Sequence, residues 1–262
     1  PPGPIRPELT PLMHLDALDQ LVAGGAAVLA GGVNALAGGG TLISFPALVA
    51  IGVPAVASNV TNTVSLVPGY LAGSWAQRDD LRPQLAQARF LAGVAGAGGL
   101  AGSILLVLLP GGSFRVAVPY LILLSCGLLL FSDRLKKLAG RPDTADRPLI
   151  MSVAIFLGAV YGGFFGAGLG IMTLAILSIF SSEPLTKLNA LKQALSFVTN
   201  IVAAVFFAFS GKTVWTLVPV MAVGSLVGGT IGGRLVKVID GAVLRRIVVI
   251  AGVAIAVYFF LK

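Results

Sequence analysis

The feature that most constrains this sequence is a long stretch without charge. Residues 21–77 contain no Asp, Glu, Lys or Arg. A membrane-spanning helix needs about 20 apolar residues, so this stretch has room for more than two passes. The whole chain agrees, since it is 56% hydrophobic and 11% charged, with a mean hydropathy of +0.97. Soluble domains carry far more polar surface. We therefore predict an all-α integral membrane protein with several spans.

The charged and metal-binding residues argue against other classes of protein. The net charge of +8 arises from basic residues in short loops between apolar runs, as the positive-inside rule describes, and does not indicate nucleic acid binding. Cys126 is the single cysteine, so there is no disulfide framework. His14 precedes the first span, and the predicted spans contain no Asp or Glu. We expect no cofactor, no metal and no enzymatic activity.

Two apolar runs are too long for one ordinary pass. The runs lie at 21–52, 57–77, 89–110, 115–131, 148–181, 190–210, 213–233 and 243–261. The first and the fifth of them contain a glycine cluster near the middle, at Gly38, Gly39 and Gly40 and at Gly166, Gly168 and Gly170. Each glycine costs about 1 kcal/mol relative to alanine inside a helix. We predict that each long run is a helical hairpin broken at its glycines.

An internal repeat relates the two halves. A shift of 130 residues aligns Gly38 with Gly168, and the same shift aligns Gly40 with Gly170, Pro54 with Pro184 and Asn59 with Asn189. These residues punctuate structure and are not common apolar residues. Chance alignment of glycine in a glycine-rich chain is the alternative, and the matched Pro and Asn favour a true repeat. Internal repeats are a usual plan of transporters.

The positions of the basic residues then indicate how the two halves are inserted in the membrane. If each broken hairpin returns to the side it entered, every Lys and Arg lies inside except Arg6, Arg115, Lys212 and Lys262. Each half then has an odd number of crossings, which makes an inverted-topology repeat of a broken-helix hairpin plus three transmembrane helices. The predicted parts are an N-terminal leader at 1–20, a first membrane repeat at 21–131, a cytoplasmic linker at 132–147 and a second membrane repeat at 148–262.

The glycine clusters are typical of an anion site. Irregular backbone at membrane depth is tolerated only inside protein or beside a wet cavity. The arm after the first tip starts at Thr41, an N-cap residue type, and its first N–H groups and helix dipole favour an anion. The second half repeats this device near Gly168 and Gly170, and we expect the two tips to meet near the midplane. The alternative is close helix packing, which we expect for Gly98, Gly102, Gly224, Gly228 and Gly232.

Polar residues follow each hairpin on one face of the next helix. They are Asn59, Asn62 and Thr63 in the first half and Asn189, Lys192, Gln193, Ser196 and Asn200 in the second, with Asn34 just before the first tip. Lys192 is the only cation in these stripes, and ionisable residues within spans usually mark a substrate path. The alternatives are that Lys192 snorkels to water, that Asn59 and Asn189 cap their helices, and that the other amides join helices.

The segments "GGVNALAGGGTLISFPALVAIGVPAVASNVTNTVSL" and "NALKQALSFVTN" resemble the motifs of the TauE/SafE family of sulfite and organosulfonate exporters. The resemblance covers about 21–262. It implies a carrier of the bacterial inner membrane for sulfite, sulfoacetate or a related sulfur anion, and it places binding at Gly38 to Gly40, Asn62, Lys192, Gln193 and Asn200. One departure is "FFGAGLGIM", which lacks a second run of three glycines and predicts a less open second tip.

The resulting hypothesis is a secondary transporter that works by alternating access around a midplane anion site. A passive anion channel built on two facing half-helices is the alternative. A membrane enzyme acting on a lipid headgroup is a third reading, disfavoured by the missing acid, base and metal ligands. The expected partners are the lipid bilayer and a small sulfur-containing anion, whereas the coupling ion and the oligomeric state are left open.

Overall fold

The described part of the chain is helical throughout. The computed structural model describes residues 15–36, 38–110, 112–131, 148–235, 249–250, 252–254 and 256–257, and no strand occurs within these ranges. The helices are α1 (Ala17–Leu36), α2 (Thr41–Ala50), α3 (Ala55–Ala76), α4 (Arg78–Leu81), the 3₁₀ helix η1 (Arg82–Gln84), α5 (Leu85–Leu108), α6 (Ser113–Leu130), α8 (Pro148–Phe164), α9 (Leu169–Phe180), α10 (Leu185–Ala208) and α11 (Val218–Leu235). The all-α prediction is confirmed for these residues, and the predicted linker at 132–147 lies outside them.

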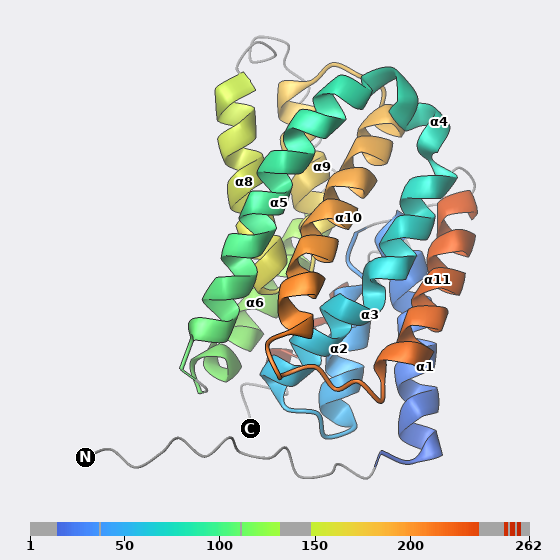
Figure 1. The fold of residues 1–262 in the computed structure, drawn as a ribbon, viewed down its shortest axis with the longest axis vertical. Coiled ribbons are helices and arrows are strands. Elements are labelled where there is room, and N and C mark those ends of the chain that lie inside the picture. The colour runs from blue at the N-terminus through green and yellow to red at the C-terminus, as the bar shows by residue number, and fades with distance from the viewer. Residues whose placement is uncertain are drawn as a thin grey trace.

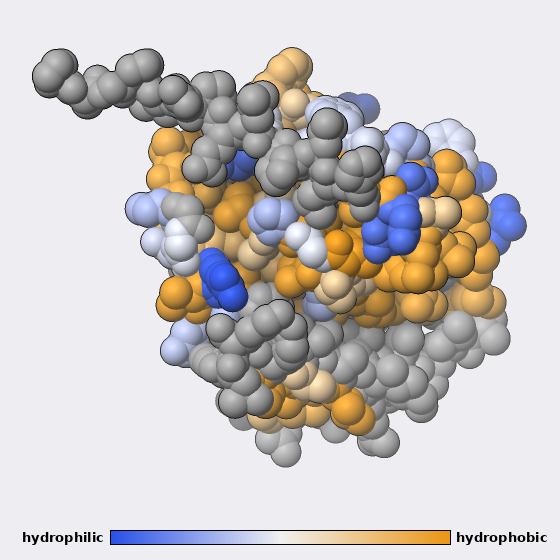
Figure 2. All heavy atoms as spheres, turned by 90° about the horizontal axis from the view of Figure 1, so that it is seen from below, coloured by the Kyte–Doolittle hydropathy of each residue, from blue (hydrophilic) through white to orange (hydrophobic). Residues whose placement is uncertain are grey.

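The outer surface of the bundle is apolar. Among the described helices, the segment Arg78–Leu108 and helices α10 and α11 are long and apolar enough to cross a membrane. Large side chains such as Phe90, Val116 and Val223 are exposed. Seen from below, the coloured surface is mostly hydrophobic and its hydrophilic residues form small groups (Figure 2). Such a surface is costly in water but suits contact with lipid chains.

Both long apolar runs are broken at their glycines. Helix α1 ends at Leu36 and α2 begins at Thr41, while α8 ends at Phe164 and α9 begins at Leu169. Gly38 and Gly168 adopt φ angles of 81° and 76°, in the left-handed region that glycine adopts without strain. In Figure 1, α1 rises from the bottom of the view and α8 descends from the top. The predicted breaks are therefore present.

The first helix begins earlier than the sequence analysis expected. Asp16 Oδ1 accepts a hydrogen bond of 2.9 Å from the Asp19 backbone N–H, and the Asp16 N–H donates to Asp19 Oδ2 at 3.1 Å. This reciprocal capping box satisfies two N–H groups at the helix start. Helix α1 consequently begins at Ala17, inside the segment that we interpreted as the leader.

The backbone repeats with the spacing found in the sequence. Helices α3 and α10 begin 130 residues apart, and their N-cap residues Pro54 and Pro184 have φ, ψ angles of −55°, 144° and −54°, 145°. Interhelical contacts repeat as well, because Gly69 lies against Gly229 of α11 and Thr199 lies against Gly99 of α5. These matches support the repeat. The opposite insertion of the two halves in a membrane remains a prediction.

Helices are exchanged between the sequence halves. Helix α11 packs against α1 and α3, whereas α5 packs against α8 and α10. We call α1, α2, α3 and α11 the first packing unit and α5, α8, α9 and α10 the second packing unit. The two units meet mainly where α3 crosses α10, near the middle of the bundle in Figure 1. Each packing unit therefore combines helices of both predicted repeats.

Glycines allow these helices to pack backbone to backbone. A Cβ atom added at Gly224 or Gly232 would lie 2.6 Å from a carbonyl oxygen of α1, and one at Gly98 would lie 2.5 Å from the Phe156 carbonyl oxygen of α8. Gly228 and Gly102 approach the carbonyls of Val28 and Val160 more closely still. The packing role predicted for these five glycines is confirmed.

We predict that Gly102→Ala destabilises the protein, because its methyl group must push α5 away from the Val160 carbonyl. Overpacking of this kind costs about 1–3 kcal/mol. Gly93→Ala on the same helix is the matched control, since a Cβ there meets nothing within 4 Å. Thermal unfolding in detergent should show a lower midpoint for Gly102→Ala alone. Equal midpoints for the two variants would contradict the close approach of α5 and α8.

Candidate anion site

The two helix breaks touch each other. A Cβ atom at Gly38 would lie 2.7 Å from the Cα of Gly170, and a Cβ at Gly170 would lie 2.8 Å from the Cα of Gly38. Only glycine at both positions permits this approach of one backbone to the other. Gly39 and Gly40 of the first tip are buried as well. The expected contact of the two tips is confirmed, whereas its position near the midplane of the membrane stays a prediction.

The first tip is held by Asn34. Its Oδ1 accepts a hydrogen bond of 2.7 Å from the Gly40 N–H, one of the N–H groups that a helix start leaves without a partner. Gly40 is the N-cap residue of α2, so the N-cap role expected for Thr41 is wrong. Thr41 is instead the first helical residue, and its Oγ1 accepts a 3.4 Å hydrogen bond from Asn62 Nδ2.

The second tip is held by two hydroxyl groups that the sequence analysis did not single out. The carbonyl of Ala167 accepts hydrogen bonds from Tyr161 Oη at 2.7 Å and from Ser125 Oγ at 2.9 Å, and the two hydroxyls lie 2.6 Å apart. Because N–H and C=O point in opposite directions across a trans peptide, the N–H of Gly168 points away from this hydroxyl pair. The only sequence signal for this contact was that Ser125 and Tyr161 are polar residues inside two of the apolar runs.

Lys192 lies at the meeting point of the tips. Its side chain is 1% exposed, and its Cδ would lie 3.5 Å from a Cβ placed on Gly170. The Gly170 N–H has no hydrogen-bond acceptor among the described residues. The alternative that Lys192 snorkels to water is wrong, since the side chain is enclosed by protein.

Asn59 of α3 and Asn189 of α10 join different helices and do not cap their own. Asn59 Nδ2 donates to the Phe164 carbonyl at 2.9 Å, which links α3 to the last residue of α8. Asn189 Nδ2 donates to Gln77 Oε1 at 2.6 Å. Since both N-cap residues are prolines, the capping alternative for Asn59 and Asn189 is wrong.

Several buried polar atoms of the expected site residues have no hydrogen-bond partner among the described residues. They are Asn34 Nδ2, Asn59 Oδ1, Asn62 Oδ1, Ser196 Oγ and both amide atoms of Gln193. A buried polar group without a partner costs about 1–3 kcal/mol. Gln193 is fully buried against Gly73 of α3. This set of atoms favours a polar ligand or water in the site.

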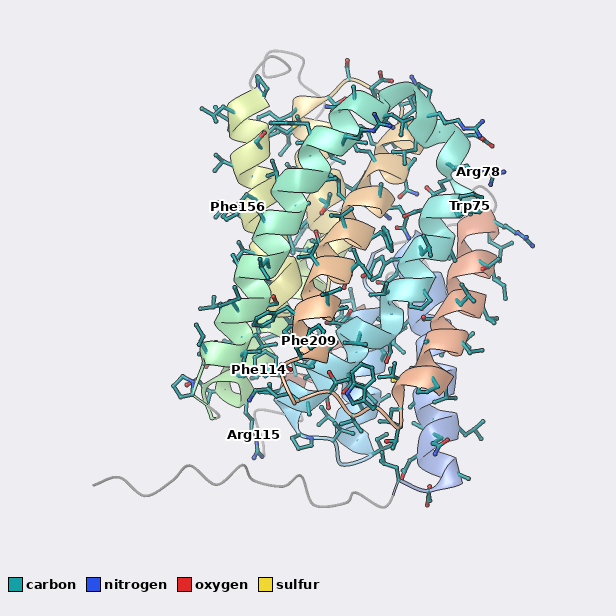
Figure 3. The ribbon with its side chains drawn as sticks, in the orientation of Figure 1. Trp75, Arg78, Phe114, Arg115, Phe156 and Phe209 are labelled. Carbon is teal, nitrogen blue, oxygen red and sulfur yellow. The ribbon has the colours of Figure 1, made fainter. Side chains whose placement is uncertain are left out.

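The remaining expected site residues lie further away. Asn200 is eight residues beyond Lys192 on α10, about 12 Å along the helix, and its Nδ2 donates to the Ser196 carbonyl at 2.8 Å. Thr63 Oγ1 donates to the Asn59 carbonyl at 3.0 Å. Asn189 and Gln77 lie where α3 ends, beside exposed Arg78, which stacks on Trp75 at the upper end of Figure 3. The structure therefore places Asn189 and Asn200 away from the tips.

Different chemistry flanks the tips towards the two ends of the bundle. Towards the end with Arg78, the hydrogen bond between Gln77 and Asn189 joins α3 to α10. Towards the other end, Phe45 of α2 packs edge-on against Phe165 at 5.4 Å, and Phe114 packs edge-on against Phe164 at 5.7 Å between ring centroids. Phe114 lies near the lower end in Figure 3. We call the four rings the aromatic cluster.

A helical membrane protein with two interrupted helices that meet beside a buried lysine has the architecture of a membrane transporter. The chain belongs to the sulfite exporter TauE/SafE family, whose family model matches residues 23–259.

Curated proteins of several bacteria are similar to the chain. A "Probable membrane transporter protein" of Haemophilus influenzae is 30% identical over 217 residues, covering 81% of this chain and 83% of that protein. The "Probable membrane transporter protein ORF9" of Sinorhizobium sp is 29% identical over 245 residues, covering 88% of each chain. The "Probable membrane transporter protein YfcA" of Escherichia coli K12 is 25% identical over 227 residues, covering 86% and 83%. No solved structure matches the chain.

We predict strong coupling between Ser125 and Tyr161, because either hydroxyl alone keeps the Ala167 carbonyl hydrogen-bonded. Ser125→Ala and Tyr161→Phe should each lower stability modestly. The double variant should lose about 1–3 kcal/mol more than the sum, the cost of an orphaned buried carbonyl. Denaturant unfolding in detergent measures the cycle. Additive losses would show that the two hydroxyls do not share one acceptor.

Proposed function

We propose that this protein is a secondary transporter that exports sulfite or a small organosulfonate by alternating access around the site at the two tips. The observation that carries the proposal is the buried Lys192 beside the contact of Gly38 with Gly170. The sulfur anion follows from the description of the family. The protein would span the bacterial inner membrane several times.

The site offers an anion hydrogen-bond donors and positive charge, which replace the hydrogen bonds that it makes to water. Helices α2 and α9 both start at the tips, and a helix start carries partial positive charge and unpaired N–H groups. Lys192 in its protonated form adds a positive charge, and the amide of Asn34 supplies a donor without a partner among the described residues. An oxyanion between the tips would accept hydrogen bonds from these groups, which offsets the cost of removing it from water.

The exchange of helices suggests which bodies move. Alternating access is rigid-body movement of one bundle against another around a fixed site. The first and second packing units fit this description, because each is joined internally by close glycine contacts. The site lies where they meet, with Gly38 and Asn62 on the first unit and Gly170 and Lys192 on the second. Movement at the α3–α10 interface would therefore open the site.

The two closures are unequal. On the predicted topology, the Gln77–Asn189 pair faces the cytoplasm and the aromatic cluster faces outwards. Separating Gln77 from Asn189 costs about 0.5–1.5 kcal/mol for a single hydrogen bond. Opening the aromatic cluster breaks several ring contacts worth about 0.5–1.5 kcal/mol each and exposes apolar surface. The inward side would open more readily, which suits a protein that loads its substrate in the cytoplasm.

A passive anion channel is the alternative function. It requires a continuous path, whereas Lys192 is enclosed between the polar pair and the aromatic cluster. Proteoliposome flux of labelled sulfite or sulfoacetate distinguishes the two. A carrier saturates and is stimulated by substrate on the opposite side, and linear flux without stimulation would favour the channel.

We predict that Lys192→Ala abolishes flux in proteoliposomes while the protein remains folded, because the main positive charge of the site is lost. Lys187→Ala is the matched control on the same helix, since Lys187 is partly exposed and pairs with Glu183 at 2.8 Å. The control should transport at the wild-type rate. Wild-type flux in Lys192→Ala would refute the site.

We predict that a cross-link between α3 and α10 arrests transport. The change is Gln77→Cys with Asn189→Cys in a Cys126→Ala background, which replaces a side-chain hydrogen bond by a covalent tie. Oxidation should stop flux and a reducing agent should restore it. The single-cysteine variants, treated with the same oxidant, are the controls. Undiminished flux in the fully cross-linked protein would show that this interface does not open.

A further inference from the structure

A groove opens on the outer face of the second packing unit, away from the tips. It has a volume of about 570 Å³ and lies between Leu100 of α5 and the side chains of Val205 and Phe206 of α10 and of Phe209, the residue that follows α10. Leu100, Val205 and Phe209 are 39%, 55% and 88% exposed. In a membrane-spanning chain such surface faces hydrocarbon. The groove extends from Ile201 to Ser210, about 14 Å along α10.

One end of the groove is polar and basic. Ser210 lines this end, and its Oγ donates to the Phe207 carbonyl at 2.7 Å and accepts the Lys212 N–H at 3.3 Å. These bonds hold the turn that carries the exposed Lys212 next to the groove. The sequence contains no acidic residue between Glu183 and Asp240 or between Leu85 and Phe131, so neither lining helix supplies a carboxylate to pair with Lys212.

Trp215 marks this end as the membrane–water boundary. It is 55% exposed three residues after Lys212, and tryptophan is enriched where hydrocarbon meets water. Along the membrane normal, the groove, Ser210 and Lys212 then follow the same order as the acyl chain, the glycerol region and the phosphate of a phospholipid. The apolar groove lies at chain depth, the hydroxyl of Ser210 lies at its end, and Lys212 reaches the level of the phosphate.

We propose that this groove is a binding site for an anionic phospholipid, with one acyl chain along α10 and the phosphate beside Lys212. Because α5 and α10 belong to the same packing unit, the lipid would stay bound while the two units move. It would brace α10, the helix that carries Lys192, against α5. The site is separate from the anion site and does not depend on the transported substrate.

Native mass spectrometry of the purified protein with phosphatidylglycerol or phosphatidylcholine tests this proposal. We expect phosphatidylglycerol to bind about fivefold more tightly, the factor for one basic residue beside an anionic surface. Lys212→Gln should abolish the preference, while Arg115→Gln, which removes an exposed cation near the start of α6, should retain it. Equal binding of the two lipids by the wild type, or an unchanged preference in Lys212→Gln, would overturn the proposal.

A second pair of variants tests the groove. Val205→Phe fills it and should reduce retention of phosphatidylglycerol, whereas Val223→Phe at a 63% exposed position of α11 should not. Quenching of Trp215 by brominated phosphatidylglycerol, in a Trp75→Phe background, locates the lipid because the chain has two tryptophans. If Val205→Phe instead dissociates a dimer and leaves lipid binding intact, the groove is an interface between copies and the proposal is wrong.

Discussion

The constraint on which the rest of this structure depends is the backbone of two helices that stop inside the bundle. Lipid offers no hydrogen bonds to a broken helix, so the N–H and C=O groups at each break need protein partners. The first break uses the amide of Asn34 and the second uses the hydroxyls of Ser125 and Tyr161. The contact of Gly38 with Gly170 then seals the two breaks against each other.

These same breaks create the proposed chemistry of the site. Starting a helix at membrane depth places its positive end there. Helix α9 begins beside Lys192, and α2 begins just after Gly38, which touches Gly170 of α9. Gln193 adds a buried amide group, and neither of its polar atoms is hydrogen-bonded to a described residue. An empty site of this kind is costly, and on our proposal a bound anion lowers that cost. Recognition and occlusion would then arise from one arrangement of backbone.

Much of this arrangement was predictable because glycine, proline and charge act locally. The breaks, the meeting of the tips and the packing glycines follow from what those residues do in any apolar helix. The tether of Ala167 was not predictable, since nothing near Ser125 or Tyr161 indicates that the two side chains meet. The exchange of α5 and α11 between the packing units was also not predictable, because a glycine face such as that of Gly228 does not specify which helix packs against it.

The exchange of α5 and α11 has a consequence for biosynthesis. Helix α1 is made well before α11, the helix that covers its glycine face. Until α11 is made, α1 must therefore wait in lipid with its closest packing surface open. Assembly of either sequence half is completed only by a helix of the other half, so neither half can bury its glycine faces alone.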